Sequence, residues 1–330
     1  MKRLLLASML VACTSAPAGD GEGESDSESV GESESESESG AGDLPSETGE
    51  TSDTDTDDPQ PLCDGTGLAP GDHVLQLEHD GRDRVFQVHV PPGYDGTVAT
   101  PLVVNLHGLG SNAMQQAFFS DMNPTADAEN FLVVYPEGTV NGDGRRAWNA
   151  GGCCTDDSSV DDVGFIRAML DELDARLCID PDRRFATGMS NGGLMSFWLG
   201  CHAADVFAAI APVAGILLAP NACNPSRPVP LWQIHGTIDE LVPFDGARDS
   251  AEAWAAINEC ATQTEVSYQN GVVTCQTWGC PTTSEVQFCT AEGVNHCWPG
   301  QLFCVDPPST ADIHSTTTIW AFFAAHPMSP

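Results

Sequence analysis

One pentapeptide, GMSNG at residues 188–192, constrains this chain more than any other stretch. It places Ser190 between two glycines, directly after the strand-like run 184–187 and before a helix-like segment. A strand-to-helix turn of this kind, a nucleophile elbow, lifts the serine hydroxyl above the edge of a sheet. The glycines fit because the turn strains the serine backbone and leaves no room for neighbouring Cβ atoms. Gly-rich loops also produce this spacing, so the rest of the chain must decide.

The N-terminus of the 330-residue chain has the pattern of an export signal. A basic start precedes the apolar run 4–11, which is too short to span a membrane and is typical of a signal peptide. The run ends in LVAC, which resembles a bacterial lipobox. Cleavage would then remove residues 1–12 and leave Cys13 to be lipidated. The alternative is ordinary secretory cleavage near Ala16 or Ala18; either way, we expect export.

Residues 13–61 contain no basic residue and consist largely of Glu, Asp, Ser, Thr and Gly. Such a segment buries too little apolar surface to offset its chain entropy, so we expect an acidic disordered tether. Calcium binding is the alternative, but no Gly-Asp repeat organises the carboxylates. As a flexible coil, the tether would reach about 40 Å from its anchor.

Residues 62–330 have the length of one α/β domain. Sixteen of the 48 acidic residues lie in the tether, which leaves 32 acids against ten arginines and a formal charge of −22 for the domain. This charge argues against nucleic acid and anionic membranes as partners. We therefore expect membrane contact only through the lipid anchor, and a monomer.

Twelve cysteines remain after Cys13, and an even number in an exported chain predicts disulfides. We expect Cys153 and Cys154 to pair with distant partners, because a bridge between neighbours is strained. A zinc site formed by the five C-terminal cysteines is the weaker alternative, since no C-x-x-C pair occurs. We expect no metal and no cofactor. The twelve are Cys63, Cys153, Cys154, Cys178, Cys201, Cys223, Cys260, Cys275, Cys280, Cys289, Cys297 and Cys304.

The apolar pattern predicts an α/β fold. Residues 74–77 and 85–90 alternate apolar and polar side chains, as half-buried antiparallel strands do. Residues 101–106 and 131–135 are continuous apolar runs, typical of parallel strands buried on both faces. A helix over 114–128, broken at Pro124, and later alternating segments complete the pattern. These are helices over 163–177, 192–202, 247–260 and 310–325, strands over 184–187, 206–213 and 229–235, and a Cys-rich hairpin region over 266–289.

Three further features lie in loops that follow predicted strands. The glycine-rich segment 107–112 follows the strand ending at Leu106, where backbone N–H groups could form an oxyanion hole. Asp239 follows the strand 229–235, and His296 lies in the loop 293–300. Ser190, Asp239 and His296 stand in the chain order of an α/β-hydrolase triad, in which histidine accepts the serine proton and the carboxylate orients the histidine.

Other side chains could fill these roles. His235 is expected to be a packed, hydrogen-bonded histidine, and Asp245 is the fallback acid. Asp161 and Asp162 resemble a carboxylate pair, but their place at a helix start predicts capping. The remaining rivals are His202, His314 and Asp205.

Six spaced motifs resemble one family of exported esterases, which includes polyhydroxybutyrate depolymerases, feruloyl esterases and acetyl xylan esterases. The resemblance spans about residues 62–326 and implies an α/β-hydrolase fold, with helices on both faces of a mostly parallel sheet. It implies the same triad and an oxyanion hole formed by the N–H groups of Leu109 and Asn191. Within the motifs, His107, Trp148 and Trp298 are candidate substrate contacts, although Trp298 could equally be core. The motifs are HG at 107–108, WNAGGCC at 148–154, VDDVGF at 160–165, GMSNGG at 188–193, HG with Asp239 at 235–239, and HCWPG at 296–300.

These features predict a serine esterase that transfers an acyl group to Ser190 and then to water. The expected substrate is a polymer-linked ester, with feruloyl or acetyl esters of plant cell-wall polysaccharide ahead of an aliphatic polyester such as polyhydroxybutyrate. A non-catalytic surface binding protein on the same shell would lack a triad member, whereas all three are present. A serine peptidase is disfavoured because peptidases of this fold usually carry an extra gating domain. The extra cysteines, including Cys297 beside the base, depart from the family pattern and could reshape the pocket.

Overall fold

The structure is a computed structural model that describes residues 63–281, 283–301, 304 and 306–328. These residues belong to the second of the two units into which the chain divides, Pro59–Pro330. The predicted signal peptide, Cys13, the whole of the predicted tether and the boundary between tether and domain lie outside the described residues. Among the helices that are described, none has both the length and the apolar character needed to cross a membrane.

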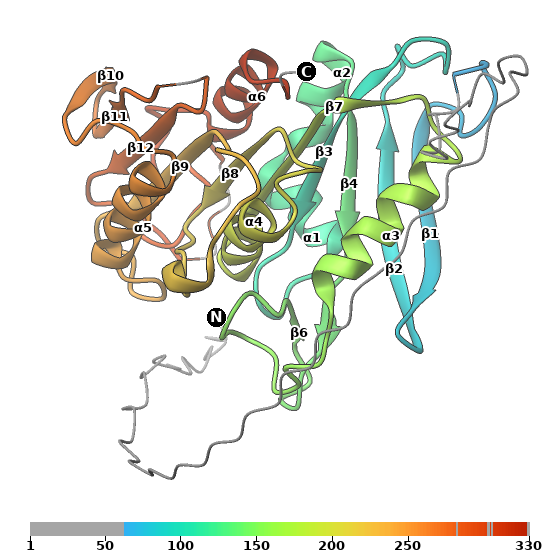
Figure 1. The fold of residues 1–330 in the computed structure, drawn as a ribbon, viewed down its shortest axis with the longest axis horizontal. Helices are drawn as coiled ribbons and strands as arrows, with labels where there is room; N and C mark the ends of the chain where they lie inside the picture. Colours follow the sequence, from blue (N-terminus) through green and yellow to red (C-terminus); the bar gives the residue numbers. More distant parts are fainter. Residues whose placement is uncertain (1–62, 282, 302–303, 305, 329–330) are drawn as a thin grey trace, which may run out of the picture. The chain divides into compact units, whose positions relative to one another are not determined.

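A ten-stranded mixed sheet organises the described residues (Figure 1). Its central strands, from β4 to β12 in sheet order, run parallel, whereas the strands at either end are antiparallel to their neighbours. The sheet order is β1 (Gly71–His79), β2 (Arg82–Val90), β4 (Leu132–Pro136), β3 (Thr100–Leu106), β7 (Ile179–Met189), β8 (Ala209–Val213), β9 (Leu231–Gly236), β12 (Val286–Ala291), β11 (Val273–Trp278) and β10 (Thr264–Asn270).

Helices cover both faces of the sheet (Figure 1). Residues of α3 (Asp162–Asp174), α4 (Asn191–His202) and α5 (Phe244–Ile257) join one buried apolar cluster. Residues of α1 (Ala113–Ser120), α2 (Met122–Glu129) and α6 (Ser315–Ala325) join a second cluster on the other face. Along β3, Leu102 and Val104 enter the first cluster and Val103 the second, as expected for a strand buried on both faces. The predicted fold class is therefore confirmed.

The segment expected as one helix over 114–128 forms two, and the break is not at Pro124. Asp121 adopts a left-handed conformation, with φ 47°, and separates α1 from α2. Pro124 is the third residue of α2. A proline is tolerated in the first turn because its missing N–H would have no intrahelical partner there.

The predicted disulfides are confirmed, and one pairing differs from expectation. Cys153 and Cys154 are bridged to each other across a cis peptide bond, with their Cα atoms 3.1 Å apart. The expectation of distant partners assumed a trans peptide, which holds successive Cα atoms about 3.8 Å apart. The C-terminal cysteines are paired in disulfides, so their thiolates are not available as zinc ligands. The other pairs are Cys63–Cys178, Cys201–Cys223, Cys260–Cys280, Cys275–Cys289 and Cys297–Cys304.

Candidate active site

Ser190 occupies a sharp turn between the end of β7 and the start of α4. Its backbone has φ 58° and ψ −124°, a conformation that residues other than glycine rarely adopt. A Cβ on Gly192 would lie 2.1 Å from the Leu106 carbonyl oxygen, and one on Gly188 would lie 2.6 Å from the same oxygen. Because β3 approaches the turn this closely, only glycine fits at either position.

The Ser190 hydroxyl has no structural task in the turn. Serine at the first position before a helix normally accepts a hydrogen bond from the helix N-terminus. Ser190 occupies that position before α4, but its side chain makes no capping bond. Its backbone is held instead, because its N–H donates to the Val213 carbonyl at 3.0 Å. The hydroxyl is therefore left available for a reactant.

The loop after β3 lies directly against this serine. A Cβ on Gly108 would be 3.3 Å from Ser190 Cβ and 3.9 Å from its Oγ. Within the described residues, the N–H groups of Leu109 and Asn191 donate no hydrogen bond. Asn191 begins α4, so its N–H has no intrahelical acceptor. The N–H groups of Leu109, which follows Gly108, and of Asn191, which follows Ser190, are thus unpaired, as the donors of an oxyanion hole must be before substrate binds.

A buried hydrogen-bond network ties this loop to the elbow. The Asn191 side chain accepts from the Trp148 N–H at 2.7 Å and donates to the Trp148 carbonyl at 3.1 Å. The Trp148 indole N–H donates to the His107 carbonyl at 2.9 Å. His107 Nε2 accepts from the Gly138 N–H, so its Nδ1 carries the proton and donates to the Gly108 carbonyl. Burial lowers the pKa of His107 to about 4, which keeps this ring neutral.

The three candidate substrate contacts lie inside the protein. His107 and Trp148 have no exposed surface, and Trp298 is 1% exposed. Trp298 donates its indole N–H to Thr316 Oγ1 at 3.0 Å, and Thr316 bonds in turn to the Ser120 carbonyl. We therefore attribute to these residues support of the surrounding loops rather than contact with substrate. The sequence pattern did not reveal the Asn191 amide as the link between elbow and Trp148.

Asp239 and His296 form a buried pair. His296 Nδ1 lies 2.8 Å from Asp239 Oδ2, and the other carboxylate oxygen accepts from the N–H groups of Leu241 and Val242. Burial acts to raise the pKa of Asp239, but hydrogen bonds from His235 and His296 outweigh it and hold that pKa well below its ordinary value. Asp239 is therefore ionised, and it orients His296 with Nε2 as the free nitrogen.

The loops that carry this pair are fastened to each other. The Ile238 N–H donates to the Val294 carbonyl at 3.1 Å, and the Glu240 N–H donates to Asn295 Oδ1 at 3.1 Å. The same Asn295 oxygen accepts from the His296 N–H at 2.9 Å. Ser190, Asp239 and His296 follow β7, β9 and β12, so all three lie at the carboxyl ends of parallel strands, along one edge of the sheet. No hydrogen bond joins the Ser190 hydroxyl to His296 in the described residues.

Comparison with known proteins identifies the family. A family model described as "Putative esterase" matches residues 78–280, which is more than half of the chain. The chain belongs to this esterase family. The matched range includes the Ser190 turn, the loop after β3 and Asp239, and it ends before His296.

Individual relatives of the chain agree with that assignment. Feruloyl esterase B of Piromyces equi is 32% identical over 229 residues, covering 63% of this chain and 42% of the relative. Probable feruloyl esterase C of Aspergillus niger is 28% identical over 257 residues, covering 75% of this chain and 86% of the relative. Several curated relatives are longer, since the chain spans 33–53% of three of them. Among solved structures, an acetyl xylan esterase from Aspergillus awamori has a TM-score of 0.57 at 17% identity, covering 77% of this chain and 99% of that one, which confirms the α/β-hydrolase fold.

The rival residues have partners of their own. The His202 ring packs at a tilt against Trp198, with ring centroids 3.9 Å apart, and His314 accepts from the Thr317 N–H at the start of α6. Asp205 pairs with Arg167 at 2.6 Å. His235 is fully buried and hydrogen-bonded, as expected.

Asp161 and Asp162 differ in their roles. Asp161 caps α3 by accepting from the Gly164 N–H at 2.8 Å, as predicted. Asp162 instead forms a buried ion pair with Arg84 at 2.6 Å and accepts from the Asn149 N–H. The sequence did not indicate this pair, because the partner lies 78 residues away.

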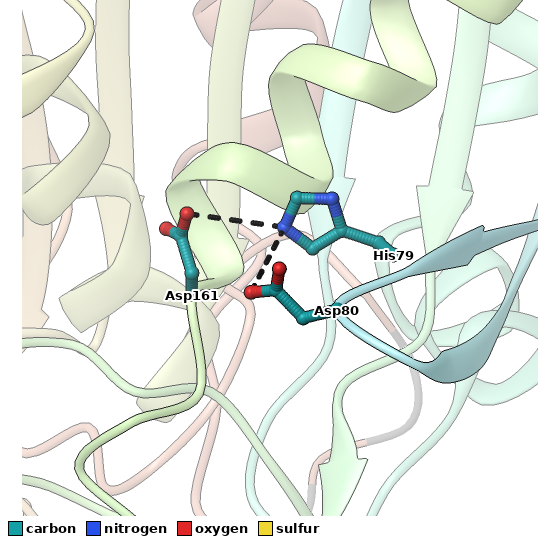
Figure 2. A group of neighbouring side chains, drawn as sticks. All are labelled: His79, Asp80 and Asp161. Carbon is teal, nitrogen blue, oxygen red and sulfur yellow. Dashed lines mark ion pairs between the residues drawn. The ribbon is translucent and has the colours of Figure 1, made fainter.

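Asp161 also belongs to a cluster at the turn of the β1–β2 hairpin. Figure 2 shows His79 Nε2 pointing between Asp80 Oδ2, at 3.6 Å, and Asp161 Oδ2, at 3.8 Å. The three donor atoms lie within 4.8 Å of one another, close enough for one divalent cation. Both carboxylates are more than half exposed and already pair with the ring, so we assign no metal to this cluster.

Proposed function

We propose that this chain is an exported serine esterase in which Ser190, His296 and Asp239 form the catalytic triad. The observation that carries the proposal is the Ser190 turn, because a strained serine at a helix start has a hydroxyl that caps nothing. The His296–Asp239 hydrogen bond supports it by supplying an oriented base at the same edge of the sheet.

The mechanism is two-step acyl transfer. His296 Nε2 accepts the proton of Ser190 Oγ as that oxygen bonds to the ester carbonyl carbon. The N–H groups of Leu109 and Asn191 receive the negative oxygen, each contributing about 10²–10³ in rate. The carbonyl re-forms, the ester bond breaks, and the leaving alcohol takes the proton from His296. Water then attacks the acyl-enzyme carbonyl carbon while His296 Nε2 accepts a proton from it. The bond from that carbon to Ser190 Oγ breaks, Oγ takes the proton back from His296, and the carboxylic acid departs.

We infer that the substrate is an ester of plant cell-wall polysaccharide, with a feruloyl or acetyl acyl group. The names of the relatives support this, since feruloyl esterases and an acetylxylan esterase/xylanase are among them. An aliphatic polyester remains the second candidate, because the family resemblance of the motifs includes depolymerases.

Export is part of the proposal. The disulfides in the described residues fit an oxidising compartment. We propose a signal peptide over 1–12, lipidation at Cys13, an acidic tether over 13–61 and a catalytic domain over 62–330.

The decisive experiment compares the wild-type protein with Ser190→Ala. We expect the variant to fold normally and to lose p-nitrophenyl acetate hydrolysis, while the wild type becomes labelled at Ser190 by a fluorophosphonate probe. Activity retained in the variant would falsify the assignment. An unreactive wild type would favour the non-catalytic binding protein. Release of ferulate or acetate from arabinoxylan, set against 3-hydroxybutyrate from polyester film, then ranks the substrates.

A further inference from the structure

A second histidine, His235, contacts the proposed catalytic acid. It is the next-to-last residue of β9, and its side chain is completely buried. Its Nε2 lies 2.8 Å from the Val242 carbonyl oxygen and 3.2 Å from Asp239 Oδ2. Asp239 Oδ2 is the oxygen that His296 Nδ1 also contacts, so one carboxylate oxygen lies between two imidazole rings.

These contacts determine where the His235 proton is. A carbonyl oxygen and an ionised carboxylate oxygen can only accept hydrogen bonds. Nε2 must therefore carry the proton and share it between Val242 and Asp239. His235 Nδ1 is buried and has no hydrogen-bond partner among the described residues. An apolar side chain would fill the same space without leaving that nitrogen unpaired, so packing alone does not account for a histidine here.

The turn that His235 holds is the one that presents the acid. Val242 bonds at both ends, since its N–H donates to Asp239 Oδ1 and its carbonyl accepts from His235. The ring thus connects the rigid end of β9 to both the backbone and the carboxylate of this turn. Phe244, at the start of α5, packs against the ring with centroids 6.4 Å apart.

We propose that His235 is a positioning residue for catalysis: its Nε2–H fixes Asp239 and the Val242 carbonyl in the geometry that orients His296. The inference rests on the proposed triad. It differs from the triad roles because His235 acts only through Asp239, exchanges no proton and need not touch substrate.

The test uses two substitutions of nearly equal shape. His235→Gln keeps an N–H donor near the position of Nε2, whereas His235→Met has none. We expect His235→Met to lower kcat for p-nitrophenyl acetate about 10-fold, with KM changed less than about twofold. His235→Gln should recover kcat to within about threefold of the wild type. Gln233→Met is the control, because Gln233 is a buried hydrogen-bonding residue of the same strand, and it should lower Tm without lowering kcat.

The outcomes separate this inference from the triad itself. Equal loss in the Gln and Met variants, or no loss in either, overturns the positioning role. If Ser190→Ala is inactive while His235→Met keeps full kcat, only the His235 inference fails; if Ser190→Ala stays active, the triad fails. If His235→Met does not fold, ¹⁵N NMR of the wild-type histidines tests which nitrogen of His235 carries the proton. The His235 signal is assigned as the one that disappears in His235→Gln. A protonated Nε2 with an unprotonated Nδ1 supports the inference, and a protonated Nδ1 overturns it.

Discussion

Replacing Asp239 by Asn tests the proposed acid, because the two oxygens of this carboxylate have different partners. Oδ1 accepts from two backbone N–H groups, those of Leu241 and Val242. An amide nitrogen cannot accept hydrogen bonds, so the asparagine oxygen must take that position and its NH₂ must face His296. His296 Nδ1 then has to accept, which moves the ring proton to Nε2. A ring protonated at Nε2 cannot take the proton of Ser190.

The expected loss in kcat/KM is about 10⁴-fold, or about 5 kcal/mol of transition-state stabilisation, since the wrong tautomer removes the base. Initial rates with p-nitrophenyl acetate at pH 7 measure it, and near-UV circular dichroism checks the fold. Asp245→Asn is the matched control, because Asp245 is exposed in the first turn of α5 and should stay within twofold of the wild type. An Asp239→Asn enzyme within tenfold of the wild type refutes the assignment. A large loss in Asp245→Asn instead transfers the role to that residue.

Two further predictions concern the elbow and its supporting loop. Gly192→Ala should cost about 3 kcal/mol or more in urea unfolding, because its Cβ would overlap the Leu106 carbonyl. Gly279→Ala, whose Cβ would meet nothing within 4 Å, should cost less than about 1 kcal/mol, and equal costs would contradict the reasoning. Burial lowers the pKa of His107 from 6.5 to about 4, so the unfolded chain binds a proton in that window and the folded chain does not. Stability should therefore fall by up to about 3 kcal/mol as pH drops from 6.5 to 4, and His107→Gln should flatten this slope; parallel profiles would refute it.

Backbone features of the site could be predicted from the sequence because they depend on local patterns. Continuous apolar runs identified β3 and β4, and their side chains do alternate between the two buried clusters. The glycines around Ser190 predicted close backbone approach, and β3 lies where their Cβ atoms would be. β7 begins at Ile179, earlier than the predicted start at 184, because residues 180–183 are three charged residues and a proline and give no apolar strand signal.

Side-chain partners far apart in sequence could not be predicted, because no pattern connects them. Asn191 bonds to Trp148 across 43 residues, and Glu240 bonds to Asn295 across 55. Both asparagines resemble ordinary loop residues in the sequence, yet each links two of the loops that form the site. The sequence also does not show whether a tryptophan in a motif faces solvent. The structure buries the candidate substrate contacts, and this burial argues against that role.

The cysteine-rich C-terminal segment has a role that its composition did not indicate. His296 reaches Asp239 only because β12 returns to pair in parallel with β9, after β10 and β11 have extended the sheet. Cys275 and Cys289 are register partners on β11 and β12, and their disulfide fixes that return. Cys297, the residue directly after the proposed base, is bridged to Cys304. The extra cysteines therefore hold the proposed base in register with the acid, which accounts for their position next to His296 without invoking any contact with substrate.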